Sequence, residues 1–443
     1  MSGISSFLER IQRHWNDPSS RDRRIVTGFL WVALFVFIGK LAGAAKEVAI
    51  AWRYGISDTV DAYSFVFNLV TWPIPVWFGL LSAVLVPIVS RLRYESPEQL
   101  ARFRRELLMV TGLLGLAAFL VAFILLPLFL KSSLAGLSPT TAMAALEMAR
   151  PLSWILPLGA VISLFSAWTM ALGRHRNTLL EAIPASAILL FLLMPAGTVP
   201  GPLVWGTVVG YLLHLVALAW PLSRSGELSA PALGMSAQPW PGFWHGMRVL
   251  VLGYALMSVT TLIDQFFAAH LETGAIATLN YANRIMALIL SLGALAINRA
   301  TLPVFSEAAA QGELDHLARR WAKWMLLGGV AVLACLWPLA HWVVRTIFER
   351  GAFTSANTSQ VAEILQLFLL QVPFYFYGLV LVAALTSRKD YFAVTLSGII
   401  GVLSRPLVNA ILVPRMGIDG IAVSAAVGYA ATSAYMAIRM RKR

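Results

Sequence analysis

Residues 25–55 read IVTGFLWVALFVFIGKLAGAAKEVAIAWRYG, an apolar run long enough to cross a membrane that nevertheless carries four charges. The charged side chains are Lys40, Lys46, Glu47 and Arg53. An unpaired charge at mid-membrane costs about 2.5–3.5 kcal/mol, so each one needs a partner, a wet cavity or a ligand. Whether the whole chain is embedded in a membrane therefore decides how these charges are interpreted.

The composition indicates a polytopic membrane protein. The chain has 443 residues, of which 58% are hydrophobic and 12% are charged. Soluble domains carry about 25% charged residues. Apolar runs near 20 residues recur along the whole sequence, as in transmembrane helices. The expected fold is all-α, with twelve spans at about 25–52, 62–90, 106–130, 151–173, 178–197, 203–222, 248–271, 279–304, 322–345, 361–386, 391–412 and 418–438.

The basic residues predict the orientation of these spans. The net charge of +13 comes mostly from arginines and lysines in short loops between apolar runs. Because such residues favour the cytoplasmic side, both termini are expected to be cytoplasmic, and nucleic acid is not an expected partner. Residues 1–24 are expected to form an amphipathic segment on the inner membrane surface. The single cysteine, Cys335, excludes a disulfide framework and is interpreted as a packing residue.

Two short motifs recur in the same order and predict an internal repeat. LVPIVSR (85–91) and TLPVFSE (301–307) share a Pro-x-x-Ser step 216 residues apart. Six spans per repeat give both halves the same orientation, so the halves would be related by a pseudo-twofold axis along the membrane normal. The predicted lobes are 25–224 and 248–443, joined by a cytoplasmic linker at 225–247. The cleft between such lobes is the expected site of a transporter.

The membrane-embedded cations favour an anionic substrate. Lys40 lies 16 residues past Arg24, roughly 24 Å along a helix, which is too deep for an easy reach to the inner interface. Lys40 and Lys46 are therefore candidate ligands for phosphate groups, with a structural Lys40–Glu47 pair as the alternative. Arg284, near the outer end of another span, is either a further ligand of this kind or an interface anchor. Gly39 and Gly43 form a small-xxx-small step, which predicts close approach of another helix or a bend.

A second polar group lies in the C-terminal half. Asp264, Arg405, Asn409 and Ser424 fall within three apolar spans. An internal Asp264–Arg405 pair is one interpretation, and a cation site built from Asp264, Asn409 and Ser424 is the other. A drug/cation antiporter would need more carboxylates, and a membrane-embedded transferase would need clustered His or acidic residues. The sequence carries neither pattern, so we expect no enzyme, metal or cofactor, while a non-transporting scaffold stays open.

Three stretches resemble the MviN/MurJ family of lipid II flippases. They are GKLAGAAKEVAIAWRYGISDTVDAYSFVF (39–67), NYANRIMALILSLGALAINRATLPVFSEA (280–308) and ERGAFT (349–354). The resemblance implies a flippase of the bacterial inner membrane that moves a polyprenyl-pyrophosphate-linked saccharide to the outer leaflet. It also implies that Lys40, Lys46 and Arg284 hold the pyrophosphate. Glu47 and Asp61 would be pairing partners that change between the inward-open and outward-open states.

The sequence departs from the family pattern in two places. TWPIPVWFGLLS (71–82) stands where the family has a run with two adjacent arginines. The family usually has fourteen spans, whereas twelve are predicted here, as in polysaccharide-unit flippases of the same superfamily. A carrier of exopolysaccharide or O-unit lipids is therefore the alternative to a lipid II flippase, and a cation-coupled multidrug antiporter is a further one. The sequence does not indicate an oligomeric state.

Overall fold

The computed structural model describes residues 21–173, 177–195, 201–311 and 313–441. All regular elements within these ranges are helices, which confirms the predicted all-α class. Most of the predicted amphipathic segment 1–24 lies outside the described residues. In chain order the helices are α2 (Arg21–Tyr54), α3 (Asp58–Thr71), α4 (Pro73–Glu95), α5 (Pro97–Lys131), η1 (Ser133–Ala135), α6 (Pro139–Ser153), α7 (Ile155–Ala171), α8 (Asn177–Leu180), α9 (Ile183–Leu192), α10 (Gly201–Arg224), α11 (Trp240–Ala269), α12 (Ala275–Gln311), α13 (Leu314–Phe348), α14 (Ser355–Leu369), α15 (Val372–Ser387), α16 (Tyr391–Met416) and α17 (Ile418–Arg441).

The helices are long and apolar enough for a polytopic membrane protein. Over the described ranges, nine spans meet the length and hydropathy expected of a membrane crossing, and the bent pair α6–α7 makes a tenth. The two remaining predicted spans fall on α2, which is 34 residues long, and on the short apolar helix α9. The predicted class is confirmed, with the fifth span shorter than expected.

Three predicted spans begin earlier than expected and contain a break. The second span is divided at Trp72, directly before Pro73, and the fourth bends by 43° at Trp154. The tenth is divided at Leu370 and Gln371, two residues before Pro373. Proline lacks an N–H and disfavours a helical conformation in the residue before it. Hydropathy does not detect such breaks, because the residues around them are as apolar as the helices.

The order of the elements repeats with the offset found in the sequence. Helix α6 and helix α14 both have 15 residues and begin 216 positions apart. Helix α4 and helix α12 end at Glu95 and Gln311, again 216 positions apart. The broken fourth span therefore has a broken counterpart in the tenth. This agreement supports the duplication, while the exact lobe boundaries stay predictions.

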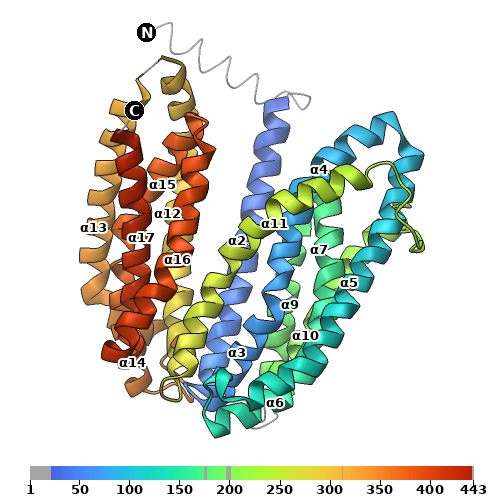
Figure 1. The fold of residues 1–443 in the computed structure, drawn as a ribbon. Helices are drawn as coiled ribbons and strands as arrows, with labels where there is room; N and C mark the ends of the chain where they lie inside the picture. Colours follow the sequence, from blue (N-terminus) through green and yellow to red (C-terminus); the bar gives the residue numbers. More distant parts are fainter. Residues whose placement is uncertain (1–20, 174–176, 196–200, 312, 442–443) are drawn as a thin grey trace, which may run out of the picture.

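Helices α2–α10 form one lobe and α12–α17 the other, and the two diverge toward one end (Figure 1). The start of α2 and the end of α17 lie at this end, which we call the open end. At the opposite end, the closed end, buried side chains from both lobes form one continuous core. A smaller core lies within the first lobe near the open end and includes the start of α11.

Helix α11 belongs to both lobes and crosses obliquely between them (Figure 1). Its first half packs on α4, where Tyr254 covers Gly79 and Gly246 lies against Val84. Its last turns are bonded to α16 of the second lobe through Asp264. The small residues Gly79 and Gly246 permit this close packing, because a side chain at either would meet the partner helix.

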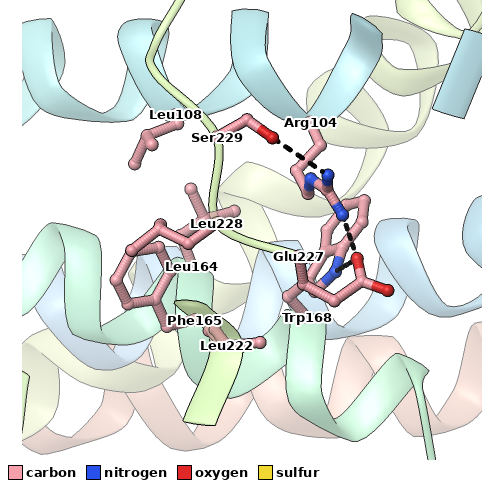
Figure 2. A pocket seen from close by; sticks show the side chains of 9 residues that line it. All are labelled: Arg104, Leu108, Leu164, Phe165, Trp168, Leu222, Glu227, Leu228 and Ser229. Carbon is pink, nitrogen blue, oxygen red and sulfur yellow. Dashed lines mark hydrogen bonds and ion pairs between the residues drawn. The ribbon is translucent and has the colours of Figure 1, made fainter. Parts of the chain in front are cut away.

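The linker between the lobes is bound to α5 by side-chain contacts (Figure 2). The Arg104 guanidinium pairs with the Glu227 carboxylate and lies over the Trp168 ring, 5.7 Å from its centroid. Trp168 Nε1 donates to the same carboxylate at 3.4 Å, and Arg104 also donates to Ser229 Oγ at 3.3 Å. Helix α11 begins at Trp240, within the range 225–247 that was predicted as the linker.

A second anchor lies two residues further along α5. The buried Glu106 carboxylate accepts hydrogen bonds from the Ser236 hydroxyl at 2.8 Å, the Ala237 N–H at 3.1 Å and Trp240 Nε1 at 2.6 Å. Hydrogen bonds to a charged group contribute about 1.5–3 kcal/mol each. These bonds join the end of the linker and the start of α11 to the first lobe.

Replacing Glu106 with glutamine is expected to loosen this anchor. The neutral amide keeps one acceptor oxygen, so the linker loses at least one charge-assisted bond, and local opening becomes about 10-fold more frequent. Hydrogen exchange at Ser236 and Ala237, followed by mass spectrometry, measures this change. Glu98→Gln, at an exposed position in the first turn of α5, is the matched control. Equal exchange in both variants would contradict the anchoring role.

Candidate functional site

Three of the predicted charges meet between the lobes near the closed end. Helix α2 supplies Lys46 and Glu47, and helix α12 of the other lobe supplies Arg284. Lys46 Nζ lies 2.8 Å from Glu47 Oε1, and Arg284 Nε lies 3.0 Å from the same oxygen. One carboxylate is therefore shared by two cations, and the group of three carries a net charge of +1. We call it the cationic cluster.

The cationic cluster is exposed mainly through Arg284. The side chains of Lys46 and Glu47 are 12% and 14% exposed, whereas that of Arg284 is 51% exposed. The cavity enclosed with α3 has room for about 20 Å³, enough for roughly one water molecule. A phosphate group would therefore reach Arg284 first and would have to displace Glu47 to reach Lys46.

Lys40 lies apart from the cluster, although the sequence grouped it with the other two cations. Its ammonium donates to Ser291 Oγ of α12 at 3.3 Å, and the side chain is exposed. Lys40 and Ser291 lie further along α2 and α12 from the closed end than Glu47 and Arg284 do. Lys40 is therefore a cation that lies nearer the open end than the cationic cluster does.

Asp61 closes the contact between the lobes, but through a different bond from the one predicted. Its carboxylate accepts the backbone N–H groups of Gly274 and Ala277, both at 2.6 Å, and the residue is 3% exposed. Asp61 therefore caps the N-terminus of α12, where unpaired N–H groups and the helix dipole favour a negative charge. Among the described residues, its hydrogen-bond partners in this conformation are the backbone amides of Gly274 and Ala277.

Two further contacts hold the closed end together. The Tyr281 hydroxyl donates to the Gly55 carbonyl at 3.0 Å, and the Ala352 N–H donates to the Trp52 carbonyl at 2.8 Å. Gly55 has a φ of +57°, and a Cβ there would meet the Ala352 carbonyl, so only glycine fits. The ERGAFT stretch noted in the sequence supplies Ala352 and thus belongs to this contact.

Gly39 and Gly43 do not permit a close helix contact in this conformation. A Cβ built on either residue would meet no described atom within 4 Å. The predicted close approach is therefore not seen at these two residues in this state, although the neighbouring Lys40 side chain reaches across to α12. A role in bending α2 stays a prediction.

The polar group of the second lobe is arranged as an internal pair. The Arg405 guanidinium lies 2.9 Å from one Asp264 oxygen, and Asn409 Nδ2 donates to the other oxygen at 3.2 Å. The Ser424 hydroxyl donates to the Ile421 carbonyl within its own helix. A cation site at Asp264 would have to compete with the guanidinium that already occupies this position. Cys335, interpreted as a packing residue, is instead exposed.

The structure adds polar residues that sequence reasoning did not assign to the site. Asn68 and Asn280 line the same cavity as the cationic cluster. The Asn280 amide nitrogen is buried and has no hydrogen-bond partner among the described residues, which makes it available to a ligand. The signal was present for Asn68, since it is the repeat counterpart of Arg284 at an offset of 216 residues.

The model of one protein family matches most of the chain. The family is described as "Lipid II flippase MurJ", and the match covers residues 50–443. The chain belongs to the MurJ lipid II flippase family. A probable MurJ flippase of Bdellovibrio bacteriovorus is 23% identical over 428 residues, which cover 91% of this chain and 80% of that protein. Its counterpart in Thermotoga maritima is 24% identical and covers 92% and 84%.

Solved structures show that the fold is shared more widely. A MurJ structure described as an inward closed conformation superimposes with a TM-score of 0.81 at 18% identity, covering 93% of this chain and 87% of that one. An inward-facing multidrug MATE transporter gives a TM-score of 0.71 at 16% identity, covering 91% and 94%. At such identities the likeness concerns the fold alone. The assignment of this chain to the MurJ family therefore rests on the match to the family's sequence model and not on the likeness of the fold.

The departure at residues 71–82 has a structural counterpart. Most of these residues form the first half of α4, which packs on α7 and α11 through Ile74 against Gly159 and through Gly79 against Tyr254. The stretch is a packing surface in this chain. The cations of the cationic cluster come from α2 and α12 instead.

Proposed function

We propose that this chain is a flippase that moves a polyprenyl-pyrophosphate-linked saccharide, in the first instance lipid II, from the inner to the outer leaflet of the bacterial inner membrane. Its action is transport and involves no catalytic step. The observation that carries the proposal is the cationic cluster, which joins the two lobes and leaves the Arg284 side chain half exposed. With both termini cytoplasmic, the open end faces the cytoplasm, where the cargo is made available.

The charges of the cluster suit a pyrophosphate better than a cationic drug. Arginine and lysine bind phosphate oxygens through charge-assisted hydrogen bonds, and Glu47 is the single acidic member of the cluster. An arriving pyrophosphate competes with Glu47 for Arg284 and Lys46. Its binding therefore releases Glu47, which weakens the contact between α2 and α12.

Release of Glu47 links cargo binding to the change of state. The closed end is then held by the Asp61 cap, the Tyr281–Gly55 bond and the Ala352–Trp52 bond, and their opening exposes the cargo to the outer side. A ligand shifts such an equilibrium only through its different affinity for the two states. A membrane potential that is negative inside favours outward movement of an anion by about 2.3 kcal/mol per charge per 100 mV.

Binding of lipid II to the purified protein in nanodiscs tests the proposal. Arg284→Ala and Lys46→Ala are each expected to raise Kd by about 10–100-fold, because each removes a charge-assisted bond worth about 1.5–3 kcal/mol. Glu47→Gln is expected to lower Kd, since it removes the competing carboxylate. Arg415→Ala is the matched control, since this exposed arginine bonds only its own helix through the Ile411 carbonyl.

The same measurement separates the alternatives. Stronger binding of an exopolysaccharide or O-unit lipid that still depends on Arg284 would keep the mechanism and change the cargo. If no polyprenyl-pyrophosphate lipid binds, or if the cluster variants bind as well as the control, the cluster is structural and the proposal is wrong.

A further inference from the structure

A second, larger cavity lies near the closed end, on the opposite face of α3 from the cationic cluster. Its volume is about 360 Å³ and its walls are almost entirely apolar. Nine residues line it, among them Phe65, Leu69, Phe129, Leu262, Phe266 and Pro406, and Gln265 is the one polar residue of the nine. We call it the apolar cavity.

Both lobes contribute to the apolar cavity. Phe65 of α3 and Phe129 of α5 stack with their ring centroids 6.4 Å apart and form the wall of the first lobe. The last turns of α11 and Pro406 of α16 form the opposite wall. Phe266 is 43% exposed, so the cavity opens beside it to the surface of an apolar span.

We propose that the apolar cavity binds one acyl chain of a bilayer phospholipid. An apolar cavity of about 150 Å³ excludes water and binds benzene, so a cavity more than twice as large accommodates a longer stretch of hydrocarbon. The burial of apolar surface stabilises this complex, and the phospholipid headgroup stays at the membrane surface. Because the mouth lies on an apolar span, an acyl chain enters it from the bilayer without crossing water.

The position of α3 selects a phospholipid over the polyprenyl chain of the cargo. Ser64 and Asn68 face the cavity of the cationic cluster, while Phe65 and Leu69 face the apolar cavity. Helix α3 therefore stands between the two. A cargo whose pyrophosphate is bound at Arg284 would have to pass its chain around this helix to reach the apolar cavity.

Occupancy of the cavity is coupled to the arrangement of the lobes. Separation of the lobes at the closed end would move Phe65 and Phe129 away from α11 and α16, so a bound chain would lose the contacts of one wall. A ligand that binds one state better stabilises that state, and here it is the state with the closed end shut. This link to transport rests on the proposed function, whereas the binding of the lipid does not.

Photo-crosslinking of the full chain in nanodiscs tests the proposal. The probe is a phosphatidylethanolamine that carries a diazirine in one acyl chain, and adducts are located by peptide mass spectrometry. Adducts are expected at residues 262–267 of α11. Leu69→Trp and Leu262→Trp fill the cavity from opposite walls and are each expected to reduce adduct yield by about tenfold, which corresponds to about 1.4 kcal/mol of lost binding.

The controls make each outcome decisive. Leu252→Trp, on the same helix but 67% exposed, is expected to leave the yield unchanged. Size-exclusion profiles establish that each variant is folded. Equal adduct yields in the filled variants and the control would show that the adducts arise from ordinary contact with the surrounding lipid. This result would overturn the proposal. Displacement of the adducts by excess lipid II would also overturn it, by assigning the cavity to the cargo. Lipid II binding at Arg284, measured separately, shows whether the proposed function fails as well.

Discussion

Asp61→Asn is expected to open the closed end of the protein. The carboxylate holds two N–H groups of the opposite lobe at 2.6 Å and complements the positive end of α12. The asparagine oxygen is neutral and keeps at most part of this interaction, so the closed state loses about 1.5–3 kcal/mol. Its population relative to the outward-open state then falls by about 10–100-fold.

Spin labels at Leu134 and Gln360, which are exposed at the closed end of the two lobes, measure this change as a longer distance in double electron–electron resonance. Cys335 is replaced by serine in all samples. Asp58→Asn is a close control, because the Asp58 carboxylate accepts hydrogen bonds from Ser138, Thr140 and Thr141 within its own lobe. An unchanged distance in Asp61→Asn would show that the cap does not hold the lobes together.

Arg405→Leu is expected to be the most destabilising single substitution in the second lobe. It leaves the Asp264 carboxylate buried without its cation, and breaking a buried pair in this way costs about 3–5 kcal/mol. Thermal unfolding in detergent, followed by circular dichroism, should show a large decrease in the midpoint temperature. The double variant Asp264→Leu with Arg405→Leu should recover most of the loss, because no charge is left unpaired.

Arg415→Leu, on the same helix, should have little effect, since Arg415 is exposed and bonds only its own helix. Addition of sodium should not change the midpoint of the unmodified protein if the guanidinium fills the position beside Asp264. A clear increase with sodium would favour the alternative cation site, because a ligand stabilises the state to which it binds.

The sequence predicted the class of the fold better than the detailed course of its helices. Apolar runs and short basic loops were enough to identify the spans, because hydropathy is the signal that a bilayer selects. The breaks at Trp72, Trp154 and Leu370 were missed, since the flanking residues are uniformly apolar. The Trp72–Pro73 dipeptide carried a usable signal, as a residue before proline disfavours the helical conformation.

Only some of the residues and contacts of the site could be predicted from the sequence. Lys46 was identified because membrane-embedded charges are costly, whereas the roles of Glu47 and Arg284 were expected from the family resemblance. The partner of Asp61 could not be predicted, since backbone N–H groups leave no trace in a sequence. Glu106 was overlooked because a carboxylate near basic loop residues looks like part of a solvated face, whereas it binds the linker.

The fastened linker determines what a reporter attached to it would measure. Arg104 and Glu106 hold the linker on either side of Gly234. A small domain inserted at Gly234 would therefore move together with the first lobe. A second domain fused after α17 would follow the other lobe. Energy transfer between such a pair would then follow individual transport cycles in a living cell, because the signal would report movement of one lobe relative to the other and not movement of a loose linker.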